Sequence, residues 1–192
     1  AHFANQNSVD NPETDIVVNG LGTLKLLQYS HLARVGKLIF ASSGCSVYGS
    51  QAPLPLQEDF VSLHLDTPYQ ITKLLGELYC NFFYNHYGLP VAIARYFNVY
   101  GPRQALSNPY TGIAAIFSSR ILNNHSPCIF EDGLQSRDFT HVSDIVQANV
   151  LAMQNDKENY QVFNVGTGRS LRVLDIARAL IEKLGSSVDI DI

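Results

Sequence analysis

Cysteine and histidine are scarce in this chain, and neither occurs in a spacing that would support a disulfide framework or a metal site. The 192 residues include three cysteines and six histidines. The cysteines, at positions 45, 80 and 128, are an odd number and include no C-x-x-C pair, so they predict no structural disulfides and indicate a reducing, cytoplasmic setting. The histidines include no H-x-H or H-E-x-x-H spacing, so we expect no metal ligands among them.

An excess of basic residues and long apolar runs are also lacking. Lysine and arginine number 13 against 17 acidic residues, and the formal net charge of −4 gives no support to nucleic-acid binding. No apolar run reaches the roughly 20 residues of a membrane-spanning helix, so no membrane partner is expected. The hydrophobic content of 46% is ordinary and is enough for a globular core.

What the sequence does contain is an alternation of strand-like and helix-like segments. Apolar runs predict strands at 37–42, 91–97 and 161–165. Helical spacing predicts helices over about 12–32, 68–87 and 111–124, from 143 onwards, and over 170–184. The apolar positions of the 12–32 helix are Ile16, Val17, Leu24 and Leu27. Such alternation is typical of an α/β fold with a doubly wound parallel sheet.

The segment 67–73 (TPYQITK) opens the 68–87 helix. Thr67 suits the N-cap and Pro68 suits the first helical position. Tyr69 and Lys73 are four residues apart and therefore share one face of this helix. A phenol has an unperturbed pKa of about 10, and a nearby ammonium or the positive end of a helix favours the phenolate. The pair can therefore make a tyrosine that removes a proton from an alcohol, although such a pair, taken alone, is more often a half-buried ring beside a solvated charge.

Two further segments, each a strand that runs into a polar loop, flank this helix in the sequence. Residues 37–49 (KLIFASSGCSVYG) precede it and residues 95–103 (RYFNVYGPR) follow it. In an open α/β sheet, ligands bind at the carboxyl ends of the strands. Together with 19–23 (NGLGT), 135–139 (QSRDF) and 162–168 (VFNVGTG), these blocks resemble, in this order, the extended short-chain dehydrogenase/reductase family. More narrowly, they are similar to its NAD-dependent nucleotide-sugar epimerases and dehydratases.

The resemblance implies a Rossmann-like doubly wound parallel sheet with part of a smaller α/β substrate domain. It assigns residues 1–100 to the C-terminal half of the NAD-binding domain, with 140–165 returning to it, and assigns 101–139 and 166–192 to the substrate-binding region. The G-x-x-G-x-x-G turn of the family does not occur here, so we expect an internal fragment without the N-terminal strands. Strand 37–42 would then present an open apolar edge, and we expect these residues neither to fold stably alone nor to bind NAD tightly.

The resemblance also implies the catalytic residues. Tyr69 is expected to be the base, and Lys73 is expected to hold the cofactor ribose and to lower the Tyr69 pKa. A Ser or Thr usually stands four residues before the tyrosine of the Val-Tyr-Gly stretch, but here that position is Gly44. Ser43 is our first candidate for the hydroxyl partner and Ser46 our second. For either serine alone, hydrogen bonding to the loop backbone is nearly as good an explanation.

Binding residues follow from the same resemblance. The residues expected to contact NAD are Ala1, His2, Asn19, Ser42, Tyr69, Lys73, Tyr96 and Phe97. Asn19 would bond backbone near the active site and order the catalytic helix; the alternative is a helix residue that faces solvent. Asn98 and Arg137 would bind the diphosphate of a nucleotide sugar, where a bidentate guanidinium fits well. The alternative for Arg137 is an ion pair with the adjacent Asp138.

The loop after strand 37–42 also indicates which reaction to expect. Family dehydratases place an Asp-Glu pair just after the hydroxyl residue, and the related decarboxylases place a Glu two residues before the tyrosine. Here Cys45 and Ser46 occupy those places, and neither is an acid at pH 7. We therefore expect epimerisation, most simply at C4 of a UDP-hexose through a transient 4-keto sugar. The alternatives are a 4,6-dehydratase or reductase of the same family, or a non-catalytic nucleotide-binding relative, which Gly44 favours.

The resemblance finally implies a homodimer in which the 12–32 and 68–87 helices pair with their symmetry mates. Exposed aromatic residues on the outer face of the 68–87 helix would fit such an interface, although core packing explains most of them. Gly88 is predicted to end that helix as a C-cap, Glu58 to anchor a loop and Arg95 to form an ion pair at the end of the sheet.

Overall fold

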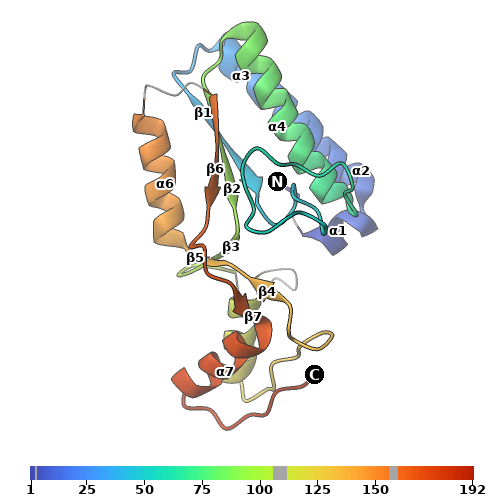
Figure 1. The fold of residues 1–192 in the computed structure, drawn as a ribbon, viewed down its shortest axis with the longest axis vertical. Helices are drawn as coiled ribbons and strands as arrows, with labels where there is room; N and C mark the ends of the chain where they lie inside the picture. The colour runs from blue at the N-terminus through green and yellow to red at the C-terminus, as the bar shows by residue number, and fades with distance from the viewer. Residues whose placement is uncertain (3, 106–111, 156–159) are drawn as a thin grey trace. The chain divides into compact units, whose positions relative to one another are not determined.

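The computed structural model describes residues 1–2, 4–105, 112–155 and 160–192 (Figure 1). They form two compact units. The first unit consists of Ala1–Tyr96 and Ile145–Val165, and the second of Phe97–Asp144 and Gly166–Ile192. Most of the predicted site lies in the first unit.

The first unit is built on a parallel sheet of three strands, β1 (Leu38–Ser43), β2 (Val91–Tyr96) and β6 (Tyr160–Val165), in the order β1-β2-β6. The register pairs Ser43 with Tyr96 and Arg95 with Asn164, so the carboxyl ends of the three strands meet at one edge. In the part of the chain that the structure describes, no strand pairs with the other side of β1. The parallel sheet that the sequence predicted is therefore confirmed.

Helices cover both faces of this sheet. Figure 1 shows α3 (Gly22–Leu32) and α4 (Pro68–Tyr87) on one side and α6 (Val142–Gln154) on the other. Two short helices, α1 (Asn5–Asp10) and α2 (Pro12–Asp15), precede α3 and contact α4. This arrangement is the doubly wound α/β fold that the alternating pattern predicts.

The predicted 12–32 helix is not a single regular α-helix. Between α2 and α3 the chain forms a π-helical segment, η1 (Ile16–Leu21), in which the backbone hydrogen bonds span one more residue than in an α-helix. Asn19 and Gly20 are buried in this segment, while Ile16 and Val17 keep 44% and 56% of their surface exposed. An α-helical periodicity wrongly places Ile16 and Val17 on the buried face, because the π segment changes which side chains point towards the core.

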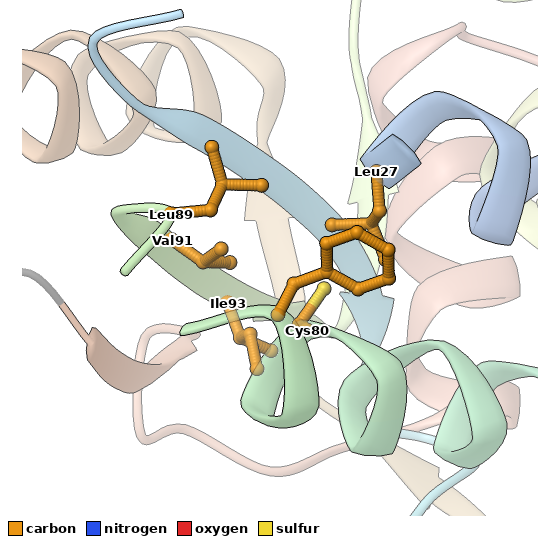
Figure 2. Packing of buried hydrophobic residues seen from close by; sticks show 6 residues of the cluster. Leu27, Cys80, Leu89, Val91 and Ile93 are labelled. Carbon is orange, nitrogen blue, oxygen red and sulfur yellow. The ribbon is translucent and has the colours of Figure 1, made fainter. Parts of the chain in front are cut away.

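The core of the first unit lies between α3, α4 and the sheet. Its buried members are Leu27, Cys80, Phe83, Leu89, Val91 and Ile93, which Figure 2 shows converging from the helices and strands. Each large apolar side chain contributes about 1.5–3 kcal/mol when fully buried. Burial raises the pKa of the Cys80 thiol to about 12, so this cysteine acts as a small apolar core residue.

Local signals set both ends of α4. Thr67 accepts a hydrogen bond from the Gln70 backbone N–H, and the Gln70 side chain accepts one from the Thr67 N–H, which forms a capping box. Gly88 has a left-handed backbone, with φ 67°, and its N–H bonds carbonyls of the last turn. The predicted cap residues and bounds of this helix are confirmed.

The second unit combines two small sheets with two helices. Strands β3 (Asn98–Tyr100) and β5 (Phe139–His141) pair in parallel, and β4 (Ser136–Arg137) and β7 (Leu171–Arg172) pair antiparallel. Helices α5 (Ile113–Leu122) and α7 (Val173–Lys183) pack against each other around a separate apolar core. Its buried residues are Phe117, Ile121, Ile129, Val173 and Ala177.

Several predicted boundaries of strands and helices differ from the structure by a few residues. The 91–97 strand ends at Tyr96, and the final helix begins at Val173 because Leu171 and Arg172 pair with β4 instead. The 111–124 helix is described from Ile113 to Leu122, and its predicted first residue lies outside the described residues.

A buried ion pair at the carboxyl end of the sheet connects α4 to β2. Arg95 is only 2% exposed, and its Nε and Nη2 donate to the two carboxylate oxygens of Glu77 at 3.0 and 2.8 Å. The Ser42 hydroxyl, at the end of β1, donates to the same carboxylate at 2.5 Å. Arg95 is therefore an ion pair at the sheet end, as predicted, and its partner is a helix residue that the sequence did not single out.

The same guanidinium holds the loop between β1 and α4. Its Nη1 donates to the Tyr48 hydroxyl at 2.9 Å and to the Glu58 and Phe60 carbonyls at 3.1 and 3.3 Å. Tyr48 donates onward to Asn164 Oδ1 at 2.7 Å, and the Glu58 carboxylate accepts from the Asn164 N–H at 2.8 Å. Glu58 is thus a loop anchor, as predicted, and this network attaches the loop to β2 and β6.

The ion pair makes a specific prediction for stability. Glu77→Gln keeps the side-chain shape but leaves the Arg95 charge buried and uncompensated, so we expect the free energy of unfolding to fall by about 3 kcal/mol. Glu182→Gln makes the same chemical change at an exposed position of α7 and should alter that free energy by less than about 0.5 kcal/mol. Urea denaturation of both variants of the full-length protein gives the comparison, and equal small effects would show that the pair does not stabilise the fold.

Candidate active site

Tyr69 and Lys73 lie on the first turns of α4, beside the end of β1. The Tyr69 ring is half-buried and Lys73 is buried. Lys73 Nζ donates to the Ala41 carbonyl at 2.8 Å and lies 5.4 Å from the centroid of the Phe40 ring and 5.7 Å from that of Tyr69. The backbone N–H of Tyr69 donates to the Ser8 hydroxyl of α1 at 3.0 Å, which satisfies one of the free donors at this helix start. The face of α4 that Tyr69 and Lys73 share therefore points towards the interior of the first unit.

The hydroxyl partners of Tyr69 form a short chain. The Ser43 side chain hydrogen-bonds the Tyr69 phenol, and Ser46 Oγ donates to Ser43 Oγ at 2.9 Å. Ser43 is thus the direct neighbour of the phenol, and the buried Ser46 supports it. Gly44, which stands where the family usually has a hydroxyl residue, is buried and has no side chain to add to this chain of hydroxyls.

The pKa of Tyr69 differs from the sequence expectation. Burial raises it above its ordinary value, the hydrogen bond from Ser43 lowers it, and the Cys45 and Asp15 side chains raise it further. The expected lowering by Lys73 is not found, because the ammonium is held by the Ala41 carbonyl rather than by the phenol. The phenol therefore holds its proton more tightly than a solvent-exposed tyrosine does.

The pKa of Lys73 is shifted in the opposite direction. Burial lowers it below its ordinary value, and the carboxylates of Asp15 and Glu77 raise it again. Lys73 is therefore a buried cation whose charge depends on nearby carboxylates.

A cluster of polar side chains joins the N-terminal segment to α4. The Asn19 side chain donates to the His2 carbonyl at 2.7 Å and accepts from the His2 N–H at 2.8 Å. It also donates to Asp15 Oδ1 at 2.9 Å and to Thr72 Oγ1 at 3.4 Å. Asn19 therefore bonds backbone and contacts the catalytic helix, and it does not face solvent. The sequence did not single out Asp15 or Thr72; the spacing of Asp15 four residues before Asn19 was the available signal.

A cavity of about 430 Å³ adjoins this cluster. Three residues predicted to contact the cofactor, Ala1, Asn19 and Lys73, line it together with Thr72 and residues 38–41 of β1. Lys73 has two N–H groups beyond the one given to Ala41, and the β1 side of the cavity is largely apolar. An ammonium beside an apolar wall fits the ribose and ring of a nicotinamide nucleotide, whereas the Asn19 amide is already bonded to His2 and Asp15.

Besides Tyr69, three other predicted cofactor residues of the first unit do not line this cavity. His2 holds Asn19 through its backbone, and the Ser42 hydroxyl is committed to Glu77. The Tyr96 hydroxyl donates to Asn149 Oδ1 of α6 at 2.7 Å, and burial raises the pKa of this phenol. The side chains of Ser42 and Tyr96 are therefore already used inside the protein.

The remaining candidates, Phe97, Asn98 and Arg137, belong to the second unit. Arg137 is exposed, its Nη1 donates to the Ser136 carbonyl at 2.8 Å, and within the described residues it forms no ion pair with Asp138. The Asn98 N–H donates to the Asp138 carbonyl at 3.0 Å. The guanidinium of Arg137 is thus available to a ligand, and the alternative of a local ion pair is not seen.

Asp138 has a different partner. Its carboxylate accepts from the Thr167 N–H and hydroxyl at 3.0 and 2.8 Å and from the Gly168 N–H at 2.7 Å. The 166–168 turn therefore gives its N–H groups to a carboxylate of this chain and does not bind phosphate through them.

Two further findings bear on the class of site. Among the described residues, no group of three or more His, Cys, Asp and Glu side chains could hold a metal ion. None of the described helices combines the length and apolarity that crossing a bilayer requires.

Comparison with known proteins places this geometry in a family. Residues 1–166 match the model of the NAD dependent epimerase/dehydratase family. A UDP-glucose 4-epimerase of Mycolicibacterium smegmatis is 37% identical over 188 residues, which cover 97% of this chain and 58% of that protein. The chain thus spans less than two thirds of the length of this relative.

Solved structures agree with this match. A UDP-glucose 4-epimerase of Thermotoga maritima, solved with UDP-glucose, is 39% identical with a TM-score of 0.93 over 100% of this chain and 61% of that chain. A UDP-glucose 4-epimerase of Thermus thermophilus, solved with NAD, is 31% identical with a TM-score of 0.88 over 100% of this chain and 62% of that chain. The fold is therefore that of Rossmann-type epimerases, and the chain belongs to the NAD dependent epimerase/dehydratase family.

Proposed function

We propose that the protein is an NAD-dependent nucleotide-sugar epimerase that inverts C4 of a UDP-hexose through a transient 4-keto sugar. The observation that carries this proposal is the chain from Ser46 to Ser43 to Tyr69, which lies next to the buried ammonium of Lys73. A phenol joined to a hydroxyl chain can take a proton from an alcohol and return it to a carbonyl oxygen. Both half-reactions of an epimerase need that reversibility.

Each residue of this site has one role. Tyr69 removes the proton of the sugar hydroxyl. Ser43 bonds the substrate oxygen and helps to pass the proton from that oxygen to the phenol oxygen. Ser46 orients Ser43 through the bond at 2.9 Å. Lys73 supplies positive charge that favours the phenolate when it turns from the Ala41 carbonyl towards a bound ribose.

Lys73 and Ala1, which line the cavity, would hold NAD in the first unit, while Asn19 lines it with a side chain already bonded to His2 and Asp15. The chemistry that NAD would supply there is reversible hydride transfer, with Tyr69 holding the proton of the same alcohol. Asn19 keeps the polar end of the cavity in place, because it fastens His2 and Thr72 at once.

We assign the second unit to substrate binding. The exposed guanidinium of Arg137 suits a diphosphate, and the Asn98 side chain is our second candidate for this contact. The first unit would then be the cofactor-binding part, as the resemblance implies for residues 1–100 and 140–165.

The loop favours epimerisation over dehydration. Cys45, not a carboxylic acid, follows Gly44 and lies close enough to Tyr69 to raise its pKa. A group that protonates and expels a hydroxyl is therefore lacking where the dehydratases place it. The names of the two similar 4-epimerases with bound UDP-glucose or NAD support the same choice.

We also propose that the protein is a cytoplasmic homodimer. Helical segments η1, α3 and α4 expose apolar side chains that a monomer would leave in water. These residues are Ile16, Val17, Leu21, Leu26, Ile71, Leu78 and Phe82. A shallow apolar hollow of about 310 Å³ lies between η1 and α4, lined by Gly20, Leu75 and Tyr79 among others. A second copy of these helices would fill it.

Substitutions in the hydroxyl chain test the proposed chemistry. In the full-length protein, Tyr69→Phe removes the proton acceptor and should lower kcat for conversion of UDP-glucose to UDP-galactose at least about 100-fold, with NAD binding retained. Ser43→Ala should lower kcat more than Ser46→Ala, because Ser43 bonds the phenol directly whereas Ser46 bonds Ser43. The product is followed by chromatography. Release of a 4-keto-6-deoxy sugar by the unaltered protein, or near-normal turnover by Tyr69→Phe, would contradict the assignment.

A charge placed on the apolar helix face tests the dimer. Leu78 on α4 is 57% exposed, so Leu78→Glu should leave the fold intact but shift the protein from dimer to monomer in analytical ultracentrifugation. Leu63 is 88% exposed in the loop before α4, so Leu63→Glu is the matched control and should remain dimeric. A monomeric unaltered protein would rule out the interface.

A further inference from the structure

A carboxylate lies buried beside the catalytic pair and has no role in the mechanism described above. Asp15, at the end of α2, has none of its surface exposed. Its Oδ2 accepts from the Thr72 hydroxyl at 2.6 Å, its Oδ1 accepts from Asn19 Nδ2 at 2.9 Å, and His2 Nδ1 lies 3.3 Å from Oδ1. A buried carboxylate is costly unless it is hydrogen-bonded or paired, so its retention here needs a reason.

Asp15 is placed against the turn of α4 that carries both catalytic side chains. Thr72, which bonds Asp15, directly precedes Lys73, and its hydroxyl also lies 3.2 Å from the Tyr69 carbonyl oxygen. The carboxylate therefore holds this turn from the side of α2 while Asn19 holds it from η1.

The charged and titratable groups around the pair come from four elements. Glu77 is on α4 itself, Cys45 is in the loop after β1, Asp15 is on α2 and His2 is in the N-terminal segment. Glu77 also raises the pKa of Lys73, but its carboxylate is ion-paired with Arg95. Within the described residues Asp15 has no lysine or arginine partner at ion-pair distance, so its charge acts on Lys73 most directly.

We propose that Asp15 is a positioning residue of the active site, whose buried negative charge holds Lys73 in its cationic form and whose hydrogen bonds fix the Tyr69–Lys73 turn of α4. The inference rests on the proposed function of that pair. Two electrostatic effects agree with it: the Asp15 carboxylate opposes the lowering of the Lys73 pKa by burial, and it adds to the raising of the Tyr69 pKa. Asp15 thus favours the ammonium form of Lys73 and also makes the Tyr69 phenol a weaker acid.

The sign of the effect follows from the charge. Removing a negative charge disfavours the protonated cation of Lys73 and favours the phenolate of Tyr69, so the pKa of each group falls. Turnover needs ionised Tyr69 and protonated Lys73, so the acidic limb of the rate profile belongs to the tyrosine and the alkaline limb to the lysine. Both limbs are expected to move to lower pH together, which a purely structural role of Asp15 would not produce.

The test compares Asp15→Asn with Asp10→Asn in the full-length protein. The asparagine introduced by Asp15→Asn keeps the size of the side chain and can still exchange hydrogen bonds with Thr72 and Asn19. Asp10 is exposed on α1, so the same substitution there removes the same charge away from the site. Phenolate absorbance is titrated for each protein, and the titration of its Tyr69→Phe counterpart is subtracted, which isolates Tyr69 without any need for turnover.

We expect the Tyr69 titration and both limbs of kcat/KM to shift down by roughly one pH unit in Asp15→Asn and to stay in place in Asp10→Asn. Asp15→Glu, which restores a carboxylate, should bring the titration back towards that of the unaltered protein. A Tyr69 titration that does not move in Asp15→Asn would overturn the proposal. A shifted titration in a protein that epimerises no nucleotide sugar would instead reject the proposed function and leave the inference about Asp15 standing.

A measurement on the unaltered protein covers the case in which Asp15→Asn does not fold. The carboxyl carbon of Asp15 is observed by ¹³C NMR between about pH 6 and pH 9. This range covers the pH at which an enzyme of this kind would work. The proposal requires an ionised carboxylate throughout that range. A protonated Asp15 at neutral pH would refute it.

Discussion

The arrangement of the active-site loop depends on one buried ion pair, Arg95 with Glu77. A pair of this kind adds little net stability compared with an apolar pair of the same shape, but losing one partner is expensive. Its value here is geometric. Arg95 uses its donors on Glu77, on the Tyr48 hydroxyl and on two loop carbonyls, so helix, strand and loop keep one relative position. That position brings Ser43 to the phenol of Tyr69 and Ala41 to the ammonium of Lys73.

The electrostatics of the site follow from burial. Burial disfavours the charged form of both side chains of the proposed catalytic pair, which raises the pKa of Tyr69 and lowers that of Lys73. Nearby polar groups then correct each shift in part: Ser43 supports the phenolate, and Asp15 and Glu77 support the ammonium. In the proposed mechanism, the phenol becomes more acidic when the ammonium turns towards it, so that it can be both the base and the acid of a reversible oxidation. Epimerisation needs this, because the proton taken in the first half-reaction is returned in the second.

Local patterns in the sequence predicted the parts of this structure that depend on near neighbours. The Thr67 cap, the Gly88 end and the shared face of Tyr69 and Lys73 all rest on residues within about one helical turn. The π segment was not predictable, because apolar spacing is read with a fixed period and η1 breaks that period at Ile16. Consequently Ile16 and Val17, whose spacing in the sequence predicted a place on the buried face of a helix, are exposed.

Partners that are far apart in the sequence were also beyond prediction. Asp15 meets Thr72 and Tyr48 meets Asn164 across separations of 57 and 116 residues, and nothing in the local pattern marks these pairs. The resemblance identified Ser43 and Ser46 as candidates, but only the fold of the loop distinguishes the serine that touches Tyr69 from the one that supports it.

The central claim is that hydrogen leaves one carbon of the sugar and returns to that same carbon. UDP-glucose deuterated at C4, incubated with the full-length protein and NAD, tests this directly when the product is analysed by NMR and mass spectrometry. The account predicts UDP-galactose that retains deuterium at C4, because the 4-keto sugar turns over in place and recovers the hydrogen it gave. Deuterium found at C6 of a deoxy sugar, or lost to the solvent, would contradict it.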